Sequence, residues 1–127
     1  MPWGLLLAIA AGGALGSLAR HFLSSGIYNV TGTAFPWGIL IVNVLGGFLM
    51  GLIVELGALK LNYNPELRAF LTTGILGGFT TFSAFSLDAA LLIERGDWGG
   101  ALLYMLGSVV LSVLALFGGL FLVRAFS

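Results

Sequence analysis

The chain has 127 residues, of which 59% are hydrophobic, and its mean hydropathy is +1.10. Five basic and five acidic residues give a net charge of zero, and charged residues make up 8% of the chain, against about 25% in a soluble domain. This composition excludes a soluble enzyme domain and indicates a small integral membrane protein, and the zero net charge argues against nucleic acid as a partner. Cysteine is absent, which excludes disulfide bonds, cysteine-ligated zinc and a thiol nucleophile.

The charged residues divide the chain into four apolar segments, and we predict that each forms a transmembrane helix. These segments are residues 3–23, 36–59, 65–93 and 97–124. Each is long enough to cross the hydrocarbon layer, which takes about 20 residues, and helices satisfy their own backbone groups in lipid. The sequence therefore predicts one all-α membrane domain over residues 1–127, with a polar loop at 24–35.

Glycines recur four residues apart in three of these segments. The pairs are Gly12 with Gly16, Gly47 with Gly51, and Gly74 with Gly78. Small residues at this spacing allow helix backbones to approach closely in lipid. We interpret the pairs as signs of a closely packed bundle.

Asn43 lies deep in the second segment, between Val42 and Val44. A buried amide without partners costs a few kcal/mol. Its NH₂ group can donate two hydrogen bonds, which an anion leaving water requires. An interhelical hydrogen bond is the alternative use of such an amide. Both interpretations remain open.

The third segment contains Gly77 and Gly78, followed by a stretch rich in Thr, Ser and Phe that ends at Ser86. This composition predicts a break in the helix over residues 74–83, where freed carbonyls could coordinate an ion. A simple packing kink is the alternative. Phe82 and Phe85 share a helix face, and the positive edge of an aromatic ring can stabilise an anion without a formal charge. Packing or lipid contact is the alternative for both rings.

In the fourth segment Tyr104, Ser108 and Ser112 form a stripe of hydroxyl groups on one helix face. Such a stripe either lines a polar track or joins helices. Glu55 and Asp88 are the acids that fall within the apolar segments, and both lie towards segment ends, unlike the central carboxylate of a proton-coupled exporter. No GxxxxGK[ST] motif is present, so we expect no nucleotide partner. His21 has no acid or nucleophile paired with it in the sequence, so we expect no enzyme activity.

The basic residues barely orient the protein in the membrane. With four spans, Lys60, Arg68 and Arg124 lie on one side, and Arg20 and Arg95 on the other. This small bias allows insertion both ways, from which an antiparallel homodimer would follow, or a single orientation set by the bias or by a partner. Four helices can hardly enclose a polar pathway, so we expect an oligomer in either case.

Residues 74–86 (GILGGFTTFSAFS) resemble the signature of the Fluc (CrcB-type) fluoride channel family. Three further elements match in order: residues 12–16 (GGALG) with Arg20, residues 37–43 (WGILIVN) with the glycines that follow, and Tyr104 with Ser108. The resemblance covers essentially the whole chain.

The resemblance implies a passive, selective channel that exports fluoride across the bacterial inner (plasma) membrane and relieves fluoride toxicity. It also implies an antiparallel, dual-topology homodimer with two pores, surrounded by membrane lipid. On this resemblance, Asn43 donates to fluoride and the ring edges of Phe82 and Phe85 contact it. The other pathway residues that it implies are Ser83, Tyr104, Ser108 and Ser112.

The resemblance further implies a structural sodium ion, held at the dimer centre by the backbone carbonyls of Gly77 and Thr80 from both subunits. Oxygen ligands suit a hard cation, and a buried cation raises the potential that nearby anions experience. On the same resemblance, Arg20 anchors the first segment and attracts anions to a vestibule.

Three positions depart from the family pattern. Ile39 and Ala84 stand where relatives often carry Thr, and Asp88 stands where they often carry Glu. Two other functions compete with the channel. A small multidrug-resistance-like, proton-coupled exporter needs an acid deep in the first segment, and residues 3–19 contain none. A structural membrane subunit would require that changes at the predicted site alter assembly and leave ion flux intact.

Overall fold

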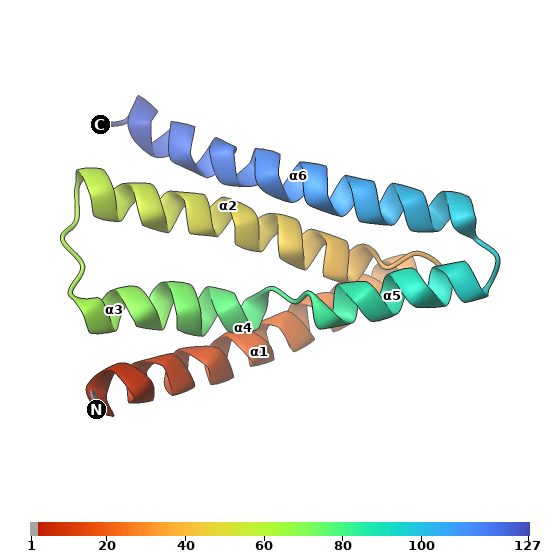
Figure 1. Ribbon diagram of the computed structural model, residues 1–127, viewed down its shortest axis with the longest axis horizontal. Helices are drawn as coiled ribbons and strands as arrows, with labels where there is room; N and C mark the ends of the chain where they lie inside the picture. The colour runs from red at the N-terminus through yellow and green to blue at the C-terminus, as the bar shows by residue number, and fades with distance from the viewer. Residues whose placement is uncertain (1–2) are drawn as a thin grey trace.

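The computed structural model describes residues 3–127, which form an antiparallel helical bundle (Figure 1). The elements are helices α1 (Trp3–Thr31), α2 (Trp37–Leu59) and α3 (Pro65–Ala69), the π-helix η1 (Phe70–Leu76), and helices α4 (Gly77–Phe79), α5 (Ser83–Glu94) and α6 (Trp98–Ala125). The predicted number of spans is confirmed, since four helical segments are long and apolar enough to cross a membrane. The start of α1 and the end of α6 lie at the same end of the bundle as the connection from α2 to α3 (Figure 1).

Helix α1 is longer than we predicted. Residues 24–31, predicted as part of a loop, continue the helix to Thr31. Their hydroxyl groups bond to the preceding turn, since Ser24 Oγ donates to the Arg20 carbonyl (2.7 Å) and Thr31 Oγ1 donates to the Ile27 carbonyl (3.0 Å). The chain turns at Gly32, whose φ of +77° is in the left-handed region that favours glycine. Arg20 consequently lies well inside α1.

The three predicted glycine pairs face neighbouring helix backbones, which confirms their packing role. A Cβ atom added at any of these six glycines would come close to backbone atoms of another element. At Gly16 it would overlap the carbonyl oxygen of Ile75 in η1, and at Gly51 that of Leu116 in α6. Helix α1 therefore lies directly against η1 and α4, and α2 lies directly against α6.

Replacing Gly16 with alanine is expected to destabilise the bundle, because the rigid backbone of η1 occupies the space of the new methyl group. We expect a loss of more than about 2 kcal/mol in the free energy of unfolding, at the upper end of overpacking effects. Gly13→Ala is the matched control on the same helix, since its Cβ would have no neighbour within 4 Å. Thermal unfolding in detergent, followed by circular dichroism, measures both. Equal stability of the two variants would contradict this packing.

The third spanning segment, Pro65–Glu94, is interrupted at residues 80–82, hereafter the break. Thr80 has extended backbone geometry (φ −83°, ψ 157°), and a new helix, α5, starts at Ser83. An interruption was predicted over 74–83, and the observed one is shorter because residues 74–79 remain in η1 and α4. The π-helix itself was not predicted. Such wide turns are rare and occur frequently at functional sites.

Candidate functional site

The side chain of Asn43 on α2 pairs with the backbone of the break. Its Nδ2 donates to the Thr81 carbonyl (3.1 Å), and its Oδ1 accepts from the Thr81 N–H (2.9 Å). The amide thus replaces the partners that Thr81 loses where the helix stops, and unpaired backbone groups are costly in lipid. The interhelical bond, one of the two uses considered for Asn43, is therefore present. No partner for its second N–H lies among residues 3–127.

Thr81 also starts the helix that follows the break. Its Oγ1 accepts from the N–H of Ala84 (3.1 Å) and lies 3.3 Å from the hydroxyl oxygen of Ser83. Ser83 itself is exposed at the first position of α5. Thr81 was not among the predicted site residues, because its role depends on Asn43, which is distant in the chain. The adjacent Thr80 and Thr81 beside the predicted break were the available signal.

A cavity of about 390 Å³ lies beside the break, between α2 and α6. It brings together most of the predicted pathway residues, namely Asn43, Phe82, Phe85, Ser108 and Ser112, and also Thr80. The other lining residues are Gly46, Gly47, Met50, Thr81, Val109, Val113 and Leu116. The cavity is thus mainly apolar with a few uncharged polar groups, and among residues 3–127 no formally charged side chain lines it.

Ser108 supplies an unpartnered polar atom to this cavity. The residue is 4% exposed, and among the described residues its hydroxyl oxygen has no hydrogen-bond partner. Buried polar groups are normally hydrogen-bonded, so this hydroxyl retains an unused donor and acceptor. Together with the second N–H of Asn43, this hydroxyl offers hydrogen bonds to a guest in the cavity.

Phe82 and Phe85 extend along one side of the cavity, with ring centroids 5.6 Å apart. Phe82 lies in the break and is 78% exposed, whereas Phe85 is partly buried on α5. The ring of Phe85 in turn contacts Tyr104 on α6, at a centroid distance of 5.1 Å. The two rings are therefore held differently, since Phe85 packs against Tyr104 and the exposed Phe82 has only the ring of Phe85 beside it.

Tyr104 is fully buried and is not among the residues that line the cavity. Its hydroxyl group donates to Oδ2 of Asp88 (3.2 Å), which joins α6 to α5. The predicted hydroxyl stripe therefore divides into two parts, because Ser108 and Ser112 face the cavity and Tyr104 supports its aromatic side. The contact between Asp88 and Tyr104 was not predicted from the sequence.

The residues predicted to hold sodium lie at the edge of the break. Thr80 Oγ1 donates to the Leu76 carbonyl (2.9 Å), and the Thr80 N–H donates to the same carbonyl (3.0 Å). Among the hydrogen bonds of residues 3–127, none is accepted by the carbonyls of Gly77 and Thr80. Two free backbone oxygens fit the ligand chemistry of a hard cation.

Arg20 and Glu55, the charged residues considered for function in α1 and α2, lie away from the cavity lining. Arg20 is partly buried on α1, and its carbonyl accepts the hydroxyl of Ser24. Glu55 is buried and forms an ion pair with Arg124 of α6, whose Nη2 is 2.9 Å from Oε2. This ion pair joins the C-terminal ends of α2 and α6.

The chain resembles known proteins over nearly its full length. Residues 7–120 match a family described as CrcB-like protein, Camphor Resistance (CrcB). A protein of Rhodospirillum centenum named fluoride-specific ion channel FluC is 54% identical over 120 residues, which cover 94% of this chain and 95% of that protein. Proteins of the same name from Rhizobium meliloti and Nitrobacter winogradskyi are 52% identical over 120 residues (94% and 96% covered) and 51% identical over 124 residues (98% of each covered).

Proposed function

Because the chain belongs to the CrcB-like family, we propose that it is a passive, fluoride-selective channel of a membrane. The observation that carries the proposal is the cavity at the break. Asn43, Phe82 and Ser108 come from three different spanning segments, and all of them line this one cavity. The relatives named fluoride-specific ion channels support fluoride as the ion.

The cavity offers fluoride several weak binding positions. Fluoride binds water strongly, so a pore must replace that water with well-placed donors. The second N–H of Asn43 and the hydroxyl of Ser108 can donate, and the edges of Phe82 and Phe85 carry partial positive charge. Because none of these groups is formally charged, the anion can also leave, which conduction requires.

The exposure of the site supports an antiparallel homodimer. In one subunit Phe82 is 78% exposed at the break, in the middle of a spanning segment. A second copy of the chain would cover this face, and the two copies would complete one pore on each side of their interface. The basic residues are few, with Lys60, Arg68 and Arg124 towards one end of the bundle, Arg95 at the other and Arg20 within α1, and this small bias is compatible with insertion in both orientations. We propose two pores per dimer on this basis.

A structural sodium ion between the two subunits fits the free carbonyls of Gly77 and Thr80. In an antiparallel dimer, the two subunits together would present four such oxygens, which suits a hard cation. The bound ion would supply positive potential near an anion pathway that has no charged side chain. The chain's own contribution is to keep these carbonyls free of hydrogen bonds.

We place the channel in the inner (plasma) membrane of a bacterium, where it would let fluoride leave the cell down its gradient and so relieve fluoride toxicity. The named relatives come from bacteria, which supports this location. A proton-coupled exporter is less compatible with the site, because both candidate carboxylates are engaged. Glu55 is paired with Arg124, and Asp88 accepts the hydroxyl of Tyr104.

Efflux from liposomes tests the proposal. Vesicles that carry the purified protein and are loaded with fluoride or with chloride are expected to release fluoride rapidly and to retain chloride, as read by ion-selective electrodes. In a second arm, sodium is replaced by a large organic cation throughout purification, and fluoride release is expected to fall. Folded dimers that release no fluoride would contradict the channel, and unchanged release without sodium would contradict the sodium site alone.

A further inference from the structure

Five aromatic rings form a continuous row from one end of the bundle to the break. Trp37 contacts Phe35 at a centroid distance of 4.7 Å, and Phe35 meets Tyr104 edge to face at 5.7 Å. Tyr104 contacts Phe85 at 5.1 Å, and Phe85 contacts Phe82 at 5.6 Å. This aromatic row therefore joins the loop between α1 and α2 to the cavity.

The outer end of the aromatic row depends on that short loop, residues 32–36. Phe35 is partly buried and packs against the same buried cluster that contains Tyr104 and that Phe85 also contacts. Its neighbour Ala34 is exposed. The position of the Phe35 ring thus depends on what holds the backbone of the loop.

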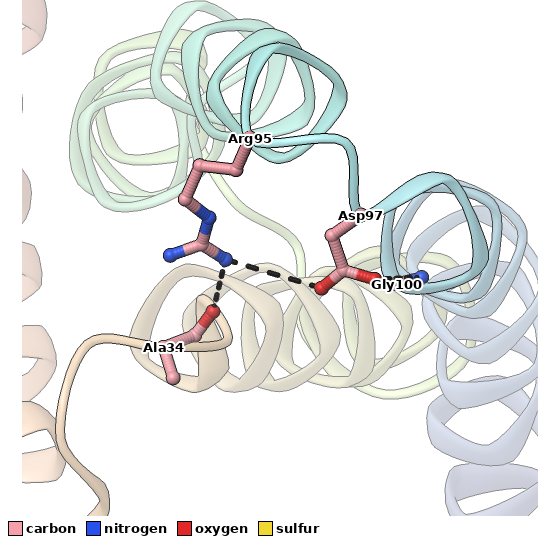
Figure 2. Close-up of polar contacts among 4 residues, drawn as sticks. All are labelled: Ala34, Arg95, Asp97 and Gly100. Atoms are coloured by element: carbon pink, nitrogen blue, oxygen red, sulfur yellow. Dashed lines mark hydrogen bonds and ion pairs between the residues drawn. The ribbon is translucent and has the colours of Figure 1, made fainter.

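Arg95, in the connection between α5 and α6, holds this backbone. Its Nη2 donates to the Ala34 carbonyl and lies 4.0 Å from Oδ2 of Asp97 (Figure 2). The other oxygen of the Asp97 carboxylate, Oδ1, accepts from the N–H of Gly100 (2.9 Å) and so caps α6. Gly96, with a φ of +80°, makes the turn that brings Arg95 and Asp97 together.

We propose that Arg95 is a positioning residue for the fluoride pathway. By holding Ala34, it keeps the ring of Phe35 against Tyr104, and Tyr104 in turn supports the ring of Phe85 that lines the cavity. Arg95 itself does not line the cavity, so it acts through the aromatic row. This inference rests on the proposed function.

The geometry separates this role from general stabilisation. The side chains of Arg95 and Asp97 are each 50% exposed, and exposed ion pairs contribute little to the stability of a fold. Tyr104, in contrast, is fully buried, and the edge-to-face contact with Phe35 occupies one side of its ring. Release of the loop therefore changes the support of Phe85 more than it changes the stability of the bundle.

The first test is fluoride efflux from liposomes carrying the Arg95→Gln variant. We expect a loss of about threefold to tenfold in rate, the net effect of one ordinary hydrogen bond, because the half-exposed Arg95 is screened by water, with little change in the unfolding temperature. Arg95→Lys, which retains a cationic donor, is expected to recover most of the rate. Lys60→Gln is the matched control, because Lys60 Nζ donates to the Phe126 carbonyl (2.7 Å) at the other end of the bundle.

Two further readouts report the aromatic row directly. In a background with Trp3→Phe and Trp98→Phe, Arg95→Gln is expected to shift the fluorescence of Trp37, and Lys60→Gln is not. Adding Arg95→Gln to Phe35→Ala is expected to cause no further loss of flux, because Arg95 acts through the ring that Phe35→Ala has already removed. Wild-type flux in Arg95→Gln, or losses that add in the double variant, would overturn the inference. Failure of the proposed function is distinct, since the unaltered protein would then release no fluoride.

Discussion

Replacing Asn43 with aspartate is expected to abolish fluoride efflux. The amide donates to the Thr81 carbonyl over 3.1 Å, and a carboxylate at that distance would place two acceptor oxygens against each other. It would also remove the second N–H that Asn43 offers to the cavity and add a negative charge that repels the anion. Removal of one partner from a buried polar pair costs several kcal/mol, so we expect the rate measured in liposomes to fall by at least about 100-fold.

Two further variants separate the ion pathway from folding. Asn29→Asp makes the same chemical change at an exposed position of α1 and is expected to leave the rate unchanged. Asn43→Ser keeps one donor but is too short to bridge both backbone groups of Thr81, and we expect an intermediate rate. A folded Asn43→Asp protein with normal flux would contradict the role of Asn43 as donor.

Much of the fold could be predicted because lipid imposes simple requirements on a sequence. Apolar segments of sufficient length define the spans, and the glycine pairs mark the faces where Gly16 and Gly51 contact neighbouring backbones. The length of α1 could not be predicted in this way. Hydropathy counts Ser24 and Thr31 as polar, yet their hydroxyls are satisfied within the helix, so a polar composition does not end it.

The members of the candidate site were predicted better than their contacts. Asn43, Phe82 and Ser108 line one cavity as expected, since amide, aromatic and hydroxyl groups are conspicuous in an apolar chain. The pairing of Asn43 with Thr81 joins residues 38 positions apart, and no local pattern specifies it. The π-helix could not be predicted either, because no characteristic amino-acid composition marks such a wide turn.

A control for the aromatic contribution of Phe82 should be a phenylalanine with similar exposure, which excludes the neighbouring Phe79. Phe79 is 6% exposed, so Phe79→Ile is expected to lower stability by about 1–3 kcal/mol, which would disturb flux indirectly. Phe22 on α1 is a better control, because it is 70% exposed, close to the 78% of Phe82, and lies outside the cavity lining.

We therefore expect Phe82→Ile to slow fluoride efflux by about tenfold, which corresponds to the loss of one aromatic interaction of roughly 1.4 kcal/mol. Isoleucine keeps the apolar surface of Phe82 but has no ring edge with partial positive charge. The unfolding temperature should hardly change, because the side chain makes few contacts within its own subunit, and Phe22→Ile should alter neither quantity. If the Phe82→Ile and Phe22→Ile variants conducted fluoride equally, the ring of Phe82 would contribute only apolar surface and no contact with the anion. Selectivity would then depend on the donors of Asn43 and Ser108 alone.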